Sequence, residues 1–175
     1  MALTASLIPS QPSLYKAPFD ATTAFTSAQT ITATGYLNNL NSGQIDLGGS
    51  NPISAAGRTD GLWQVYISAV NMVTTDEFYR FALLGSNDVA FGNGNVELLD
   101  FFDIAALSAN RQIATILGAS PAIPPTGKAA TVFQRPCNNL QQEILYRYLR
   151  AYVVVGGTSP SVTCTSWFSR AQVDI

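Results

Sequence analysis

Two stretches of this sequence alternate in side-chain character with a period of two, and they constrain the fold more than any other feature. In GLWQVYISAV one predicted face carries Trp63, Val65, Ile67 and Ala69, and the other carries Gln64, Tyr66, Ser68 and Val70. In ILYRYLRAYVVVGG one predicted face carries Tyr146, Tyr148, Arg150 and Tyr152, and the other carries Leu145, Arg147, Leu149, Ala151, Val153 and Val155. Because successive side chains of a strand point to opposite faces of a sheet, this period predicts β-strands.

Turn-forming clusters separate these stretches from further strand-like segments. We predict strands in AQTITATGYL, QIDLGGSNP, EFYRFALLGS and SVTCTSWFSR, and a strand or a short helix in VELLDFFDIAAL. The turn signals GSND and FGNGN predict a hairpin, GTSP predicts the turn into the last strand, and the proline-rich ILGASPAIPPTGKAA predicts a loop. About seven or eight strands with few helical windows indicate one all-β domain, a sandwich or a barrel.

Residues 1–26 differ from the rest, and we expect an extended N-terminal arm ahead of a single domain at 27–175. Three prolines in this segment break any regular element, while large apolar residues are scattered between serines and threonines. We expect this arm to dock on its own domain or on a neighbour. The interface candidates are Leu7, Ile8, Tyr15 and Phe19.

The chain has an unusually low content of charged residues. Charged residues make up 11%, with a net charge of −2, whereas an average soluble domain has about 25%. Polarity comes from 16 Thr, 15 Ser and 11 Asn instead. Such a surface predicts no nucleic-acid partner, and it suits a protein that lies against neighbouring subunits. No stretch approaches the apolar length of a membrane span, and the N-terminus lacks a signal peptide's cationic region, so we expect no membrane partner.

Histidine is absent, which removes the commonest general base and metal ligand. The carboxylates Asp76 and Glu77, and Asp100 with Asp103, lack the spacing of a calcium loop and are read as solvated. We expect Cys164 in the core and Cys137, beside a proline in a loop, to be more exposed. The glycine-rich GNGN and the pair Gly156-Gly157 are read as turns with positive φ. We therefore predict no enzyme, no cofactor and no metal.

Arginines and tyrosines near the C-terminus offer two weaker alternatives. Arg147 and Arg150 point to opposite faces of the predicted strand, so together with Arg135 they are read as packed or paired with carboxylates. Their functional alternative is a set of interface ion pairs. The tyrosines at 146, 148 and 152 are read as one face of a sheet, with sugar stacking as the alternative.

Four segments, in a fixed order, resemble a known family over about residues 27–170. They are SAQTITATGYL, GQIDLGGSNP, FYRFALLGSNDVAFGNGNVELLDF and YRYLRAYVVVGGTSPSVTCTSWFS. Their succession is similar to that of the capsid cement, or decoration, proteins of tailed phages of the Bordetella-phage type.

The resemblance implies a jelly-roll-like antiparallel β-sandwich without enzymatic activity. It implies a structural virion protein that binds the outside of an HK97-type capsid, with the major capsid protein and further copies of itself, as a dimer or trimer, for partners. We expect such a protein to be made in the host cytoplasm. The alternative is a head-fibre or tail adhesin module that binds host glycan.

Overall fold

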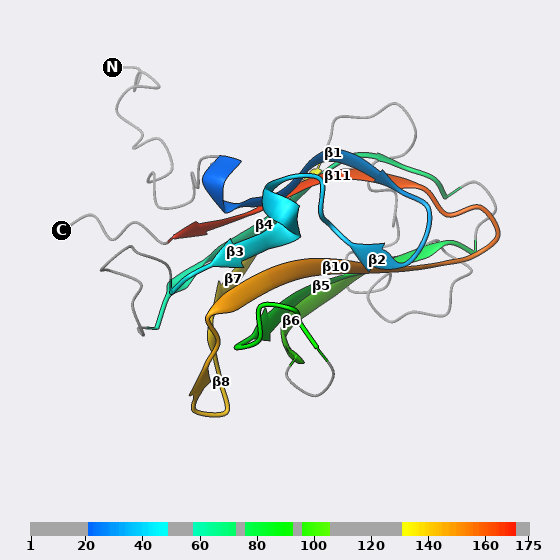
Figure 1. Ribbon diagram of the computed structural model, residues 1–175. Coiled ribbons are helices and arrows are strands. Elements are labelled where there is room, and N and C mark those ends of the chain that lie inside the picture. The colour runs from blue at the N-terminus through cyan, green and yellow to red at the C-terminus, as the bar shows by residue number, and fades with distance from the viewer. Residues whose placement is uncertain (1–20, 49–57, 73–75, 93–95, 106–130, 171–175) are drawn as a thin grey trace, which may run out of the picture.

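Two antiparallel sheets face each other across one apolar core in the computed structural model (Figure 1). The structure describes residues 21–48, 58–72, 76–92, 96–105 and 131–170. The predicted antiparallel all-β sandwich is confirmed, and it contains seven strands of eight or more residues within those ranges. The interface candidates Leu7, Ile8, Tyr15 and Phe19 and the predicted proline-rich loop lie outside them.

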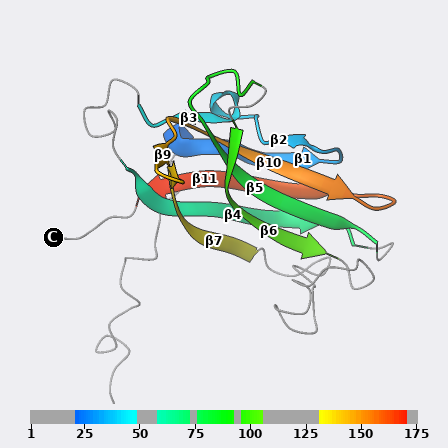
Figure 2. The same cartoon turned by 90° about the horizontal axis from the view of Figure 1, so that it is seen from below.

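The four-stranded sheet has the order β1-β11-β4-β7, and the five-stranded sheet has the order β2-β10-β5-β6, with β3 beside β10 (Figure 2). The four-stranded sheet consists of β1 (Ala24–Ile31), β4 (Asp60–Val70), β7 (Thr131–Asn138) and β11 (Val162–Arg170). The five-stranded sheet consists of β2 (Gly35–Tyr36), β3 (Gln44–Asp46), β5 (Phe78–Ser86), β6 (Val96–Ala105) and β10 (Tyr148–Gly156). A separate hairpin pairs β8 (Leu140–Gln141) with β9 (Ile144–Leu145), and two short 3₁₀ turns are η3 (Ala21–Thr23) and η4 (Asn41–Gly43).

The core lies between the two inner faces and follows the predicted alternation. The inward residues of the two alternating stretches are fully or almost fully buried; they are Trp63, Val65, Ile67, Leu149, Ala151 and Val153. Phe102 joins the sheets, because its ring centroid lies 5.1 Å from that of Phe81 on its own sheet and 4.7 Å from that of Phe133 on the other. Stacked aromatic contacts of this kind add to the stabilisation from apolar burial.

Several predicted elements are confirmed in position. The segment left open between strand and helix is the strand β6, and it forms the predicted antiparallel hairpin with β5. Cys164 is fully buried, as expected. Strand β1 begins at Ala24, and Phe25 lies in the core, so residues 24–26 of the expected arm belong to a strand.

The predicted face of β4 is wrong at its end because of a bulge. Ile67 pairs with Cys164 while Ala69 pairs with Thr163, so one extra residue on β4 lies between these pairs. A bulge of this type shifts the following residues to the opposite face. As a result Ala69 is exposed and Val70 is buried, which reverses the expectation for both.

The predicted long strand over ILYRYLRAYVVVGG is also wrong, because it is two strands. Strand β10 begins at Tyr148, and the residues before it belong to the β8–β9 hairpin. The backbone N–H of Tyr146 donates to the Asn139 carbonyl at 2.8 Å, which closes the base of that hairpin. Leu145 and Arg147 are therefore exposed, although the alternation placed them on one face with Leu149, which is buried in the core.

Strands β10 and β11 are not paired with each other, contrary to the predicted return through the GTSP turn. Strand β10 belongs to the five-stranded sheet and β11 to the four-stranded sheet, so the connection crosses from one layer to the other. Gly157, with φ of 107°, supports the prediction of positive φ in this segment. Gly156 is not among the residues with positive φ, so the expectation is wrong for it; the ring of Phe78 occupies the space that a side chain there would need.

Strand β7 was not predicted from the sequence. It is the edge strand of its sheet, where a proline is tolerated because one side of the strand needs no ladder hydrogen bonds. Pro136 pairs with Leu62 there, and Cys137 follows it within the strand, so the prediction of a loop at Cys137 is wrong. Among the described residues, no helix is long and apolar enough to cross a membrane.

Candidate functional site

The outer face of the five-stranded sheet carries an aromatic group around Arg150, which we call the Arg150 site (Tyr36, Phe91 and Arg150). The guanidinium carbon of Arg150 lies 4.9 Å from the ring centroid of Tyr36 and 4.9 Å from that of Phe91. These are cation–π distances. Arg150 projects outward because its neighbours on β10, Leu149 and Ala151, point into the core. Its Nε is buried and has no hydrogen-bond partner among the described residues.

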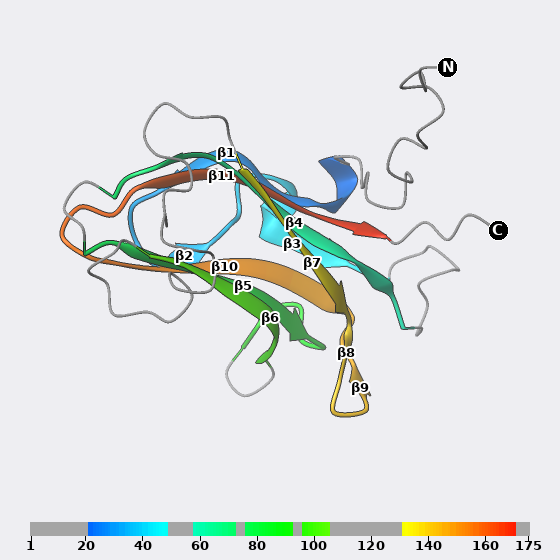
Figure 3. The same cartoon turned by 180° about the vertical axis from the view of Figure 1, so that it is seen from behind.

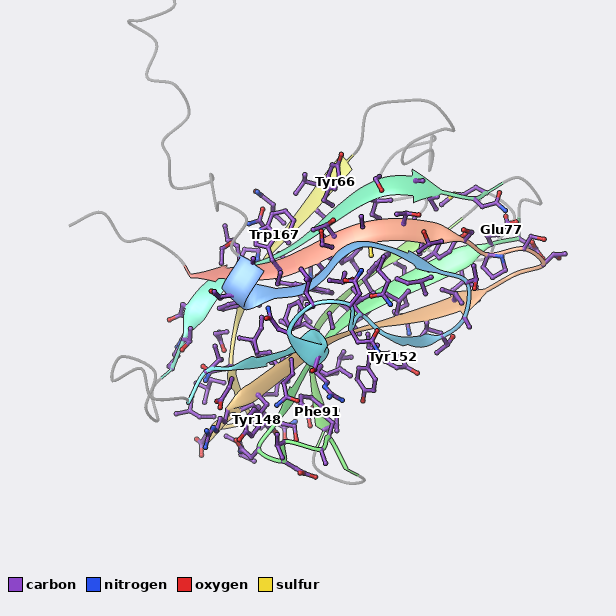
Figure 4. All side chains as sticks on the ribbon, turned by 45° about the horizontal axis from the view of Figure 1, so that its top comes forward. Tyr66, Glu77, Phe91, Tyr148, Tyr152 and Trp167 are labelled. Carbon is purple, nitrogen blue, oxygen red and sulfur yellow. The ribbon has the colours of Figure 1, made fainter. Side chains whose placement is uncertain are left out.

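Strand register brings the tyrosines to this face. Tyr36 pairs with Tyr152 across β2 and β10, and their rings meet edge to face at 5.0 Å. Figure 4 shows Phe91, Tyr148 and Tyr152 on one side of the sandwich, and Tyr66 and Trp167 on the other. The predicted tyrosine face therefore holds for Tyr148 and Tyr152. Tyr146 lies before β10 and packs against Gly85, so it does not join them.

The loop after β5 holds Phe91 in place. Asp88 accepts hydrogen bonds from the backbone N–H of Ala90 at 2.9 Å and of Gly92 at 3.0 Å, and its carbonyl accepts one from Phe91. Phe91 has φ of 52°, a left-handed conformation that is uncommon for a large side chain. Strain of this kind persists where the surroundings fix it, and here it places the ring against Arg150.

The β6 end of the same outer face is apolar and exposed, and we call it the β6 patch (Val96, Leu98 and Phe101). Leu98 is 42% exposed and Phe101 41%, whereas Phe102, the next residue, is 6% exposed in the core. The Arg80 guanidinium lies 4.9 Å from the Phe101 ring centroid and covers part of it. Contiguous exposed apolar side chains of this kind are typical of interaction surfaces.

Most arginines of the described chain are neutralised within the molecule. Arg80 bonds both oxygens of Asp103, Arg135 those of Asp100, and Arg147 those of Asp46, all at 2.7–2.9 Å. The expected pairing of Arg135 and Arg147 with carboxylates is confirmed. Hydrogen bonds from Arg147 lower the pKa of Asp46, and the carboxylate of Asp100 raises the pKa of Arg135.

Arg150 differs from these pairs. Arg58 also has a carboxylate neighbour, Asp60 at 2.9 Å, whereas Arg150 has none within the part of the chain that the structure describes. Among the described residues, the interactions of its guanidinium group are the cation–π contacts with Tyr36 and Phe91. The Arg150 site therefore has an unused capacity to bind an anion.

The β8–β9 hairpin is the second unusual feature of the surface. It extends from the sandwich on the side of the five-stranded sheet (Figures 1 and 3). Its turn residues, Gln142 with φ of 47° and Glu143 with φ of 66°, are both left-handed and neither is glycine. Such two-residue turns favour Asn-Gly. Ile144 beside the turn is 49% exposed.

The carboxylates that the sequence analysis considered for catalysis or calcium binding do not come together in one site. Asp100 and Asp103 lie on opposite faces of β6, each held by a different arginine. Asp76 bonds the backbone and hydroxyl of Thr158, which ties the turn after β10 to β5. In the described ranges, no group of three or more acidic or cysteine residues is placed to hold a metal ion.

Both cysteines are poorly reactive. Burial raises the pKa of Cys164 to about 12. Burial likewise raises the pKa of Cys137 to about 12, with hydrogen bonding to the backbone of Trp63 acting in the opposite direction. Because the thiolate is the reactive form, neither side chain is poised for redox or nucleophilic chemistry at neutral pH.

Sequence reasoning missed two members of the Arg150 site. Tyr36 reaches Arg150 through the pairing of β2 with β10, a contact between residues far apart in the chain. Phe91 begins the segment FGNGN, for which the sequence predicts only a turn. The spacing of Asp88 from Gly92 is the local signal of a capped loop that presents the residue between them.

Comparison with known proteins gives no family for this chain. No family model matches the sequence, and no curated protein matches it either. The resemblance to phage cement proteins therefore stays a prediction.

Proposed function

We propose that this chain is a structural protein of a phage virion that binds the outer surface of an HK97-type capsid and cements neighbouring capsid subunits. The observation that carries the proposal is the outer face of the five-stranded sheet, where the β6 patch and the Arg150 site lie on one surface. We assign the β6 patch to the major capsid protein and the Arg150 site to further copies of the chain. The expected non-enzymatic role, the virion location and both partners belong to this proposal.

The strand order supports the finer, jelly-roll form of the sandwich. Strands β1, β4, β7 and β11 form one sheet, while β2, β3, β5, β6 and β10 form the other, so the chain passes repeatedly between the layers. Neighbours within the four-stranded sheet are far apart in sequence, as in β1 beside β11. Such connectivity is typical of double Greek-key sandwiches. It is the fold that the resemblance implies.

The pairing of charges within the molecule supports binding by apolar and neutral contacts. With the arginines of β5, β7 and the β9–β10 connection held by aspartates, few charges on the described surface are left for a partner. An interface built this way depends little on ionic strength.

The direct test is co-sedimentation of the full chain with capsid shells that lack it. We expect saturable, stoichiometric binding that changes by less than about threefold between about 0.1 M and 1 M salt, because screening weakens exposed charge pairs selectively. Shells that fail to bind the chain, or that release it in moderate salt, would overturn the proposal.

A glycan-binding adhesin module is the second candidate, and the Tyr36–Tyr152 pair favours it. Half-buried tyrosine rings on a sheet face are suitable for stacking against sugars. Saturable binding of the isolated chain to a glycan array, lost in Tyr152→Ala, would support this candidate. Binding to shells without binding to glycans would exclude it in favour of the cement role.

A further inference from the structure

Arg150 and Glu143 are opposite charges that the described chain leaves unpaired on the same side of the molecule. Arg150 lies in the corner between the rings of Tyr36 and Phe91 and has no carboxylate among the described residues. Glu143 is exposed at the tip of the β8–β9 hairpin, and none of the ion pairs between described residues includes it. Strand β10, which carries Arg150, belongs to the five-stranded sheet, and the β8–β9 hairpin, whose turn contains Glu143, extends on the same side of the sandwich (Figure 1).

The surroundings of Arg150 determine which chemical group can bind to it. The rings of Tyr36 and Phe91 are 6.4 Å apart and nearly perpendicular, so they hold the guanidinium without accepting conventional hydrogen bonds from it. A planar guanidinium donates in a fork that matches the two oxygens of a carboxylate. Apolar surroundings strengthen that pairing because water competes less. The fitting ligand is a carboxylate beside an apolar group.

The tip of the hairpin presents that combination. Glu143 is followed by Ile144 and Leu145, both exposed. Left-handed conformations at Gln142 and Glu143, neither of which is glycine, cost stability. The base is fixed, because Asn87 donates to the Leu145 carbonyl at 3.0 Å and accepts from the Arg147 N–H at 2.9 Å. A fixed base and a strained, apolar tip are suited to insertion into a partner.

We propose that the Arg150 site binds the Glu143 carboxylate of a second copy of this chain, with Ile144 packing beside the aromatic rings. This inference deepens the homo-oligomer part of the proposed function and does not depend on shell binding. A second copy is the favoured occupant because both halves of the contact, the cation with its rings and the carboxylate with its apolar neighbour, belong to one chain. Such a contact either repeats reciprocally in a two-fold dimer or runs head to tail, in which case it closes a ring if the rotation between copies closes and forms an open filament if it does not.

The test is the mass of the full chain by analytical ultracentrifugation over a range of concentrations. We expect the wild-type chain to associate and both Glu143→Gln and Arg150→Gln to weaken association at least tenfold. The doubly swapped chain, Glu143→Arg with Arg150→Glu, is expected to regain association that either swap alone abolishes. Glu97→Gln is the matched control, because it removes the same charge from β6 and is expected to leave association unchanged.

A second variant separates the contact from folding. Gln142→Asn with Glu143→Gly gives the turn its preferred residues, so the melting temperature is expected to rise while association is lost. A monomeric wild-type chain, or single variants that associate as well as wild type, would overturn the inference. Arg150 variants that lose shell binding but keep self-association would assign the site to an acidic residue of the shell instead, and would equally overturn it. Failure of shell binding alone would count against the proposed function only.

Discussion

The outer faces of the two sheets of this sandwich are built on different principles. On the four-stranded sheet, neutral polar side chains hydrogen-bond to one another across the strands. Gln134 donates to Gln64 at 2.9 Å, and Gln64 donates to Ser169 at 3.2 Å, which links β7, β4 and β11. We call these three residues the polar ladder. Farther along, the hydroxyls of Thr30 and Thr163 lie 2.8 Å apart across β1 and β11.

On the five-stranded sheet, fewer of the outward side chains find partners within the described chain. The β6 patch exposes large apolar side chains, and Arg150 is held by rings without a carboxylate in the described chain. Gln64 of the polar ladder, by contrast, is 1% exposed although it points away from the core. A face whose hydrogen bonds are already made gains little free energy from binding a partner. Exposed apolar area, by contrast, gains from burial, and an unpaired cation gains from pairing with an anion.

The difference indicates which side of a sandwich with few charges is better suited to binding a partner. Both sheets share the same core, so the core does not distinguish them. The outward residues make the distinction, and they do so mostly with neutral groups. The comparison leads to four predictions.

The largest expected effect distinguishes two neighbouring residues of β6, of which Phe102 lies in the core and Phe101 lies in the β6 patch. Phe102→Ala removes the ring that contacts Phe81, Phe133 and Trp63, so we expect a loss of about 3 to 5 kcal/mol in the free energy of unfolding. Phe101→Ala, one residue away on the exposed face, is the matched control and is expected to cost below about 1 kcal/mol. Denaturant unfolding measures both, and equal losses would show that the two faces of β6 are misassigned.

The next prediction tests the β6 patch directly. Leu98→Lys combined with Phe101→Lys places charges on that surface and is expected to weaken shell binding at least about tenfold, equivalent to about 1.4 kcal/mol, with little change in stability. Val132→Lys is the matched control, because Val132 is similarly exposed on β7 of the other sheet. Co-sedimentation compares them. A stronger effect from Val132→Lys would reverse the assignment of the two faces.

A smaller effect is expected from the polar ladder. Gln64→Leu removes the acceptor of Gln134 and the donor to Ser169 at a buried position, so we expect a loss of about 1 to 2 kcal/mol in unfolding free energy and unchanged shell binding. Val132→Ala, on the same edge strand but exposed and outside the polar ladder, is the control and is expected to change stability by about 0.5 kcal/mol or less. If Gln64→Leu folds but binds shells less well, the outer face of the four-stranded sheet takes part in binding, contrary to this prediction.

The smallest effect concerns pH. Hydrogen bonds from Arg147 lower the pKa of Asp46, so this pair stabilises the folded chain above the carboxyl's ordinary pKa of about 3.9 and loses that contribution as pH falls through the lowered value. Both side chains are substantially exposed, so solvent screening keeps the effect small. Unfolding at pH 7 and at pH 3 is expected to show a larger cost for Asp46→Asn at the higher pH. A cost of the same size at pH 3 would rule out the ion pair as its source.

The sequence predicted the strands whose alternation is uninterrupted and failed where local backbone irregularity decides. Strand β5 and the first part of β4 follow the period of two closely, and their inward residues form the core. The bulge before Ala69 and the hairpin before Tyr148 reverse or end that period, and nothing in residue type marks either position. The layer change between β10 and β11 likewise depends on pairing with distant strands.

The candidate site was predictable only in part. Alternation on β10 placed Tyr148, Arg150 and Tyr152 on one face, and the structure keeps them there. Tyr36 joins them through strand register, which no local pattern encodes, and Phe91 joins them through a loop whose local signal is the spacing of Asp88 from Gly92. The β6 patch was hidden because VELLDFFDIAAL left strand and helix open, and only a strand separates Phe101 from Phe102.

The most direct measurement is a cryo-EM reconstruction of the particle with the chain bound. We expect a sandwich on the outer surface of the shell, with the β6 patch against a capsid subunit and the polar ladder facing away from the contact. Density that places the four-stranded sheet against the shell, or that leaves Leu98 and Phe101 in solvent, would contradict it.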